Sequence, residues 1–214
     1  MSPRPPARTA ALLAAVALGL TGALAACGDD PTSTSSTSVP ASAPFNDADV
    51  GFATDMIPHH AQALAMVDLA RGRPLPPPVR RLAQRILDAQ GPEIRTMAGW
   101  LQDWHRPVPP TMRDQVNADD HGGMGGMGYV NGTDNGSDLP GMMTAQQMRD
   151  LARASDADFA DQWLRDMIQH HEGAIAMART EQSSGEYAPA KALARRIADV
   201  QAREIERMNA MLAS

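Results

Sequence analysis

Two short stretches of the chain carry four of its six histidines, together with acids and methionines that could bind a metal ion or move a proton. They read DMIPHHAQALAM, from Asp55 to Met66, and DMIQHHEGAIAM, from Asp166 to Met177. In each stretch an acid stands four residues before a His-His pair, so the acid and the first histidine share one face if the stretch is helical. Helical bundles build metal sites from inward-facing imidazole and carboxylate groups of this kind.

The two stretches belong to an internal repeat. Aligning the chain with itself at an offset of 111 positions pairs 52–101 with 163–212 without a gap, and about 19 of the 50 pairs are identical. A second shared pattern, Q-x-x-E-I-x-x-M, runs from Gln90 to Met97 and again from Gln201 to Met208. This degree of self-similarity indicates a duplicated domain.

The elements that position both motifs are predicted to be helices. Capping residues such as Asn46, Ser155 and the Thr144/Gln147 pair mark their starts, and Gly and Pro mark their ends. No segment shows the alternation of a strand. Two duplicated helical hairpins predict an all-α, ferritin-like four-helix bundle with a pseudo-two-fold axis. The predicted helices run over about 46–71, 78–104, 144–154, 155–184 and 188–213.

Two prolines fall inside the predicted helices of the first copy. Pro58 precedes His59, and Pro92 precedes Glu93. A proline inside a helix removes a backbone donor and tends to kink the helix. We therefore expect the two copies to be inequivalent, and Gly91-Pro92 to divide the second helix into two.

Helical phase predicts that each hairpin sends an Asp, two His, a Gln, a Glu and Met side chains toward the bundle interior. At about 100° per residue, both histidines flank the centre of the face opposite the charged one, and the Gln and Glu lie within an apolar stripe of the partner helix. The inward polar residues are Asp55, His59, His60, Gln90 and Glu93 in the first copy, and Asp166, His170, His171, Gln201 and Glu204 in the second.

These buried polar groups have two interpretations. Each one left unpaired would cost about 1 to 3 kcal/mol, so they must satisfy one another or hold something. One interpretation is a closed hydrogen-bond network in which Asp or Glu accepts from a histidine N–H. The other is a metal site between facing helices. The spacing differs from the Glu-x-x-His of di-iron bundles, which leaves a ferritin-like iron or manganese oxidoreductase as a further alternative.

Fourteen methionines bear on the metal. Those beside the histidines lie at core spacing, where packing explains each one taken alone. Others occur in a Gly-rich linker that has no core of its own, and there the alternative is a disordered loop with incidental methionines. Thioether and imidazole ligands select Cu(I) over hard cations. The candidate ligands are His59, His60, His170, His171, Met56, Met66, Met167 and Met177, with His121, Met124, Met127, Met142 and Met143 in the linker.

The N-terminus reads as a bacterial lipoprotein signal. Residues 1–27 hold two arginines, an Ala/Leu-rich apolar run and a small-residue box that ends in Cys27, the only cysteine. We expect Cys27 to carry lipid, palmitate included, and 28–45 to be a flexible Ser/Thr/Pro tether. The domain would then span 46–214, with copy one at 46–105, the linker at 106–143 and copy two at 144–214. Without its signal the protein has a formal charge of −8 instead of −6, and no basic cluster, so we expect no nucleic-acid partner.

The doubled D-M-I-x-H-H motif, the paired Q-x-x-E-I-x-x-M motif and Met142-Met143-Thr144 together resemble a bacterial family known as domain of unknown function 305. The resemblance covers nearly all of Asn46–Ser214. It implies a ferritin-like four-helix fold, an extracytoplasmic location in many members and, for some members, copper binding and copper tolerance. Only the histidines of the two motifs and the adjacent methionines are carried over as site residues.

The leading hypothesis is a lipid-anchored, extracytoplasmic protein that sequesters or buffers copper through His and Met, with Asp55, Glu93, Asp166 and Glu204 orienting the imidazoles. No nucleophile stands beside a base, so we expect no enzymatic turnover. The alternatives are an adaptor or structural lipoprotein with an envelope protein as partner, and the iron or manganese oxidoreductase.

Overall fold

The computed structural model describes residues 43–111 and 139–214. The chain divides into two units, 1–39 and 40–214, and every described residue belongs to the second. All regular secondary structure in the described residues is α-helical, as the sequence predicts. The predicted lipid site Cys27, the signal, most of the tether and the linker residues His121, Met124 and Met127 lie outside the described residues.

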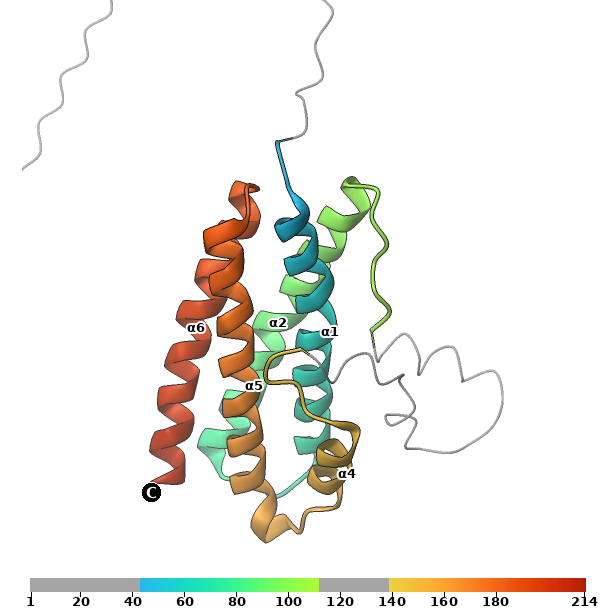
Figure 1. Ribbon diagram of the computed structural model, residues 1–214. Coiled ribbons are helices and arrows are strands. Elements are labelled where there is room, and N and C mark those ends of the chain that lie inside the picture. The colour runs from blue at the N-terminus through green and yellow to red at the C-terminus, as the bar shows by residue number, and fades with distance from the viewer. Residues whose placement is uncertain (1–42, 112–138) are drawn as a thin grey trace, which may run out of the picture. The chain divides into compact units, whose positions relative to one another are not determined.

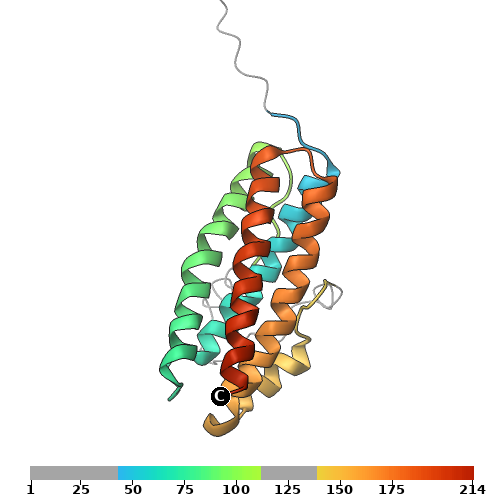
Figure 2. The same cartoon turned by 90° about the vertical axis from the view of Figure 1, so that its left-hand side faces the viewer.

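Four long helices lie side by side as a bundle, and one short helix packs against its side (Figures 1 and 2). Helices α1 and α2 form one hairpin and α5 and α6 the other, while α1 and α5 pack against each other in opposite directions. The short helix α4 contacts α1 and α5. The bounds are Asp47–Ala70 for α1, Pro77–Asp103 for α2, Ala145–Arg153 for α4, Asp156–Ser184 for α5 and Ala188–Leu212 for α6. They agree with the predicted ranges to within two residues.

The predicted caps form, and one of them also joins two elements at the same end of the bundle. Asn46 and Asp49 make a reciprocal capping box at the start of α1. The Asp49 carboxylate accepts from the backbone N–H of Asn46 at 2.7 Å, and also from those of Glu186 at 3.1 Å and Tyr187 at 2.9 Å. The start of α1 is thereby tied to the turn between α5 and α6.

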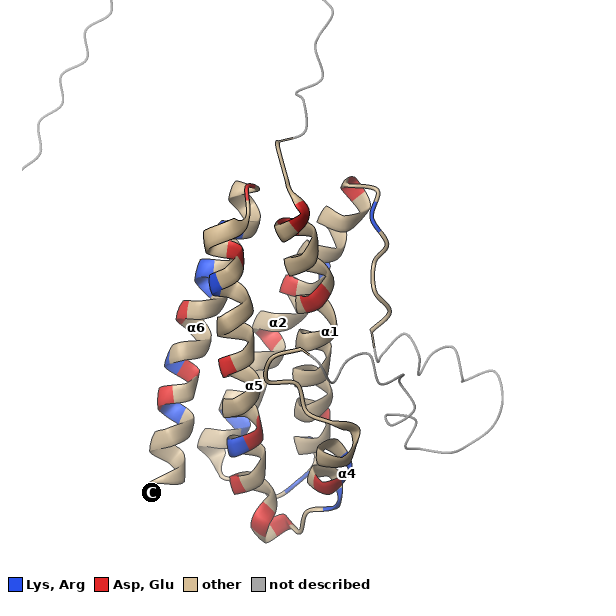
Figure 3. Ribbon diagram, in the orientation of Figure 1, with Lys and Arg blue, Asp and Glu red and all other residues tan. Residues whose placement is uncertain are grey.

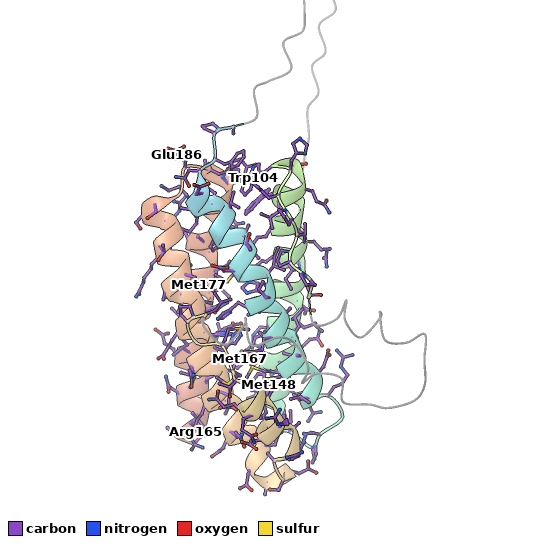
Figure 4. All side chains as sticks on the ribbon, turned by 45° about the vertical axis from the view of Figure 1, so that its right-hand side comes forward. Trp104, Met148, Arg165, Met167, Met177 and Glu186 are labelled. Carbon is purple, nitrogen blue, oxygen red and sulfur yellow. The ribbon has the colours of Figure 1, made fainter. Side chains whose placement is uncertain are left out.

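The apolar core consists of two clusters at opposite ends of the bundle. The cluster near α4, the α4-side cluster, contains residues from the second half of α1 and the first halves of α2 and α5. The cluster near Trp104, the Trp104-side cluster, contains residues from the other halves of these three helices. Figure 4 shows Met148 and Met167 toward one end and Trp104 at the other. Large fully buried members include Met66, Leu82, Ile86, Leu151, Phe159, Trp163, Met167 and Met208 on the α4 side, and Met56, Ile57, Met97 and Leu101 on the Trp104 side.

The expected break at Gly91-Pro92 is wrong, because α2 is continuous from Pro77 to Asp103. Pro92 is exposed, so its ring projects into solvent. Proline has no N–H to donate to the carbonyl one turn earlier in the helix, and on this side of α2 water can reach that carbonyl instead. The hydroxyl of Thr96 donates to the Pro92 carbonyl at 3.1 Å. Pro58 likewise lies inside an uninterrupted α1.

Charge is distributed unevenly over the helices, and every charged residue of α1 is acidic. Figure 3 shows acidic and basic residues interspersed along α6, whereas the middle of α1 carries none over 56–67. The uncharged part of α1 surrounds its His-His pair. None of the described helices combines the length and the apolar character that crossing a membrane requires.

Candidate metal centre

A layer of polar side chains crosses the middle of the bundle. On each long helix its members lie between residues of the α4-side cluster and residues of the Trp104-side cluster. All four histidines are 0% exposed, and the two Gln are nearly as deeply buried. We call this set the polar layer: His59 and His60 from α1, Gln90 and Glu93 from α2, His170 and His171 from α5, and Gln201 and Glu204 from α6.

Each hairpin contributes one His–Glu pair to the polar layer. His60 Nε2–H donates to Glu93 Oε2 at 2.8 Å, and His171 Nε2–H donates to Glu204 Oε2 at 2.9 Å. The two pairs occupy equivalent positions of the repeat. Because the carboxylates accept at Nε2, the imidazoles are fixed in the tautomer whose lone pair lies on Nδ1.

The two copies meet at a histidine pair. The rings of His59 and His170 have centroids 3.9 Å apart and are tilted by 42°. These residues are equivalent under the 111-residue offset, so the pseudo-two-fold axis that relates the copies passes between them. The polar layer is therefore one cluster shared by both hairpins.

The equivalence of the copies ends at this pair. His59 Nε2–H donates to the carbonyl of Pro140 at 3.0 Å. Neither ring nitrogen of His170 has a hydrogen-bond partner. The difference arises because the segment that leads into α4 passes this pair and meets only one of the two rings.

Several polar atoms of the layer are buried without a partner. Every histidine of the layer leaves Nδ1 unpaired, and Gln90 leaves both of its amide atoms unpaired. A closed hydrogen-bond network would satisfy these atoms, since each orphan costs about 1 to 3 kcal/mol. The unpaired atoms are Nδ1 of His59, His60, His170 and His171, Nε2 of His170, both side-chain polar atoms of Gln90, and Oε1 of Gln201.

Burial holds His59, His170 and His171 in their neutral form. Burial and the nearby His60 and His171 together lower the pKa of His59 to about 3, against the hydrogen bond that His59 donates to the Pro140 carbonyl. Burial likewise puts the pKa of His170 well below its usual value. The pKa of His171 is also lowered by burial, although Glu204 opposes this. Neutral imidazole is the form that binds metal ions.

The arrangement provides imidazole lone pairs but no complete carboxylate-and-histidine cage. Within 43–111 and 139–214, no three His, Cys, Asp or Glu side chains are grouped so as to hold an ion. Hard cations require several oxygen ligands, which this layer lacks. The polar layer is better suited to a soft ion that needs few ligands. Cu(I) is such an ion, because it accepts imidazole and thioether ligands.

Packing accounts for those of the methionines predicted as ligands that lie within the described residues. Met56, Met66 and Met167 are fully buried in the two apolar clusters, and Met177 is partly buried against the Trp104-side cluster. Met142 and Met143 are also buried, and Met143 belongs to the α4-side cluster. Their role as ligands stays a prediction.

The predicted inward placement of the two acids is wrong for Asp55 and only partly met for Asp166. Asp55 is exposed, and His59 Nδ1 has no partner, so this acid does not orient His59. Asp55 lies about 80° from the centre of the buried helix face, where a short carboxylate can still reach water and avoid the cost of burial. Asp166 is half-buried, and it likewise makes no hydrogen bond to His170.

Sequence reasoning missed the segment that contacts His59. Leu139, Pro140, Gly141 and Met142 form a tight turn, with Met142 N–H donating to the Leu139 carbonyl at 3.1 Å and Gly141 at φ +77°. A Pro-Gly dipeptide signals such a turn. Nothing in the spacing says that its carbonyl reaches a histidine.

The match to a family model follows the same boundaries as the bundle. The model described as "Domain of unknown function (DUF305)" matches residues 49–212. The chain belongs to the DUF305 family. No curated protein matches the chain.

Solved structures of DUF305 proteins resemble this one over most of its length. A DUF305 fragment from Deinococcus radiodurans is 26% identical with a TM-score of 0.64, covering 79% of this chain and 98% of its own. A candidate secreted DUF305 protein from Streptomyces coelicolor is 32% identical with a TM-score of 0.62, covering 78% and 92%. CopM in its Cu(II)-bound form is 28% identical with a TM-score of 0.58, covering 77% and 95%. CopM has also been solved in Cu(I)-bound and Ag-bound forms.

Proposed function

We propose that this DUF305 protein binds copper outside the cytoplasm, as a sequestering or buffering protein without turnover, and that the ion is held at the polar layer. The observation that carries the proposal is the set of buried, unpaired imidazole nitrogens contributed by both copies. A protein that used these histidines only to fix its fold would gain by pairing them.

The structural relatives support copper as the ion. CopM, which is similar over 77% of this chain, has been solved with Cu(II), with Cu(I) and with silver. Copper(I) and silver(I) are soft ions that accept imidazole and thioether ligands. The polar layer and the buried methionines next to it on α1 and α5 offer both ligand types.

The lipoprotein-like N-terminus supports a place outside the cytoplasmic membrane. Residues 1–27 have the pattern of a signal that ends at Cys27, and a DUF305 relative from Streptomyces coelicolor is a candidate secreted protein. With its domain on a tether, the protein would intercept copper before it enters the cell.

The oxidoreductase alternative lacks a supporting observation in the site. Ferritin-like di-iron centres use several carboxylates and histidines per pair of ions. Here Glu93 and Glu204 are each engaged with a histidine, and the acids next to the motif lie at or near the surface. Copper binding without turnover therefore fits the described residues better.

The decisive experiment is a titration of the metal-free protein with Cu(I) against a competing chelator. We expect binding tighter than micromolar by the wild type and loss of that binding in His59→Asn and His170→Asn. The matched control is His105→Asn, which changes an exposed histidine outside the layer, and Asn tolerates the φ of 55° at this position.

Each outcome points to one function. Wild-type binding no tighter than micromolar refutes the copper proposal. Loss of folding in both layer variants, measured by circular dichroism, with no Cu(I) binding by the wild type favours a structural network. Iron uptake accompanied by oxygen consumption favours the oxidoreductase.

A further inference from the structure

Residues 139–143, which we call the strap, lie across α1 and α5 beside the His59–His170 pair. The strap is a Pro-Gly turn followed by Met142 and Met143. Its position of closest approach to the polar layer is the Pro140 carbonyl, which accepts from His59 Nε2–H at 3.0 Å. In a turn of this kind that carbonyl takes no part in the turn's own hydrogen bond, so it is free to accept from a side chain.

Two residues hold the strap in place, and they are equivalent positions of the repeat. On α1, the Gln62 side chain makes two hydrogen bonds to the backbone of Met143: its Nε2 donates to the carbonyl at 2.8 Å, and its Oε1 accepts from the N–H at 2.6 Å. On α5 the equivalent residue is Gly173. A Cβ atom there would overlap the Pro140 carbonyl and crowd Gly141.

The copies therefore differ at the position that the strap needs. In copy one a buried amide binds the strap, and in copy two the absence of a side chain admits it. The hydrogen-bond partners of the Gln62 side chain, and the atoms that a Cβ at Gly173 would meet, all belong to the strap. This pairing of a buried Gln with a Gly is explained if the strap must sit at one defined place over the shared histidine pair.

We propose that the strap is a positioning element of the copper site, which fixes His59 in the Nε2–H tautomer so that Nδ1 is the nitrogen that binds the ion. This inference rests on the proposed function. It assigns the positioning role to Pro140, Gln62 and Gly173, none of which contacts the ion.

The strap then does for His59 what a glutamate does for the two outer histidines. Glu93 and Glu204 hold His60 and His171 through Nε2, and the Pro140 carbonyl holds His59 through the same atom. Three of the four imidazoles thus present Nδ1. Groups that orient a ligating histidine in this way typically contribute 10- to 100-fold in metal affinity.

The test uses Gly173→Ala in the full chain, with Gly99→Ala as its matched control. Both changes add one methyl group to a glycine inside a long helix, but the space around Gly99 is open, whereas the methyl at 173 meets the strap. Because Pro140 is exposed, we expect the strap to be displaced while the bundle stays intact. Gln62→Ala, which removes the two hydrogen bonds, is the second variant in case Gly173→Ala does not fold.

Two readouts are recorded on each protein. In the metal-free state, proton–nitrogen correlation spectra of ¹⁵N-histidine-labelled protein report which ring nitrogen of His59 carries the proton. On addition of Cu(I) alone, the same spectra report which nitrogen binds, and chelator competition gives the affinity. We expect Nε2–H and Nδ1 binding in wild type and Gly99→Ala, and mixed tautomers with about 10- to 100-fold weaker binding in Gly173→Ala.

The inference is overturned if metal-free His59 carries its proton on Nδ1, or if Gly173→Ala and Gln62→Ala keep both the tautomer and the affinity of the wild type. Failure of the wild type to bind Cu(I) would instead refute the proposed function. The metal-free spectra would still show whether the strap sets the tautomer, so the two failures are distinguishable.

Discussion

A carboxyl pair that closes one end of the bundle should contribute less to stability as the pH rises. Glu181 of α5 is 1% exposed and lies beside Asp49 of α1. Burial raises the pKa of Asp49, but the backbone N–H groups of Asn46, Glu186 and Tyr187 outweigh this and lower it overall. Burial, with Asp49 as hydrogen-bond partner and neighbouring charge, raises the pKa of Glu181 to about 8 despite the opposing charge of Lys191. At neutral pH Glu181 is therefore protonated and Asp49 is ionised.

The sign follows from the two states of Glu181. Its pKa is 4.5 in the unfolded chain and about 8 in the folded one, so between these values the folded state holds a proton that the unfolded state has lost. The stabilising contribution is complete below pH 4.5 and is lost as the pH rises through 8. One proton of difference corresponds to a slope of about 1.4 kcal/mol per pH unit. From pH 5.5 to 7.5 the loss is therefore about 3 kcal/mol.

The measurement is urea unfolding of the wild type and Glu181→Gln at half-unit steps over this range. The Gln side chain keeps a donor for Asp49 and does not titrate, so the wild-type free energy of unfolding should fall by about 3 kcal/mol relative to the variant. Comparing the two proteins cancels the titration of the histidines. Glu172→Gln, an exposed change on the same helix, should follow the wild type. If the free energies of unfolding of the wild type and Glu181→Gln change in parallel with pH, Glu181 does not have the raised pKa.

Three further changes test the layer and the core. Acidification should destabilise the metal-free protein, because the pKa of His59 is lowered from 6.5 to about 3, mainly by burial. The contribution of neutral His59 to the free energy of unfolding is fully present above pH 6.5 and is lost as the pH falls toward 3. Urea unfolding of His59→Asn should show a smaller loss, and an equal loss would contradict this. Glu204→Gln should weaken Cu(I) binding by about 10- to 100-fold in chelator competition, because it loosens His171; unchanged affinity would separate Glu204 from the site. Trp163→Ala should cost about 3 to 5 kcal/mol in urea unfolding, because the side chain is fully buried and donates to the Met66 carbonyl; a cost below 1 kcal/mol would mean that the core refills the space.

The helices and the polar layer could be predicted because the signals are local or periodic. Asn46, Ser155 and the Thr144/Gln147 pair are capping residues, and each caps a helix here. Helical phase placed His60 and Glu93 on inward faces of one hairpin, and they form a hydrogen bond. Because the sequence is duplicated, the same prediction applies to the equivalent residues of the second hairpin.

Phase alone failed where a residue stands at the edge of a face or where the chain crosses between copies. Asp55 has the right spacing to share a helix face with His59. It stands at the margin of the buried face, however, and there the cost of removing a carboxylate from water keeps its side chain exposed. The continuity of α2 through Pro92 likewise depends on which side of the helix faces water. The contact of Pro140 with His59 joins residues 81 positions apart, and no periodic pattern encodes it.

The position of His59 and His170 on the axis between the copies has an evolutionary consequence. A single hairpin carries only half of this pair, so an ancestral hairpin would have completed the histidine cluster only by associating with a second copy of itself. Fusing two copies into one chain removed the dependence on protein concentration. It also released each half from having to match the other, and the divergence of Gln62 and Gly173 is a change that a symmetric pair of identical chains could not have made.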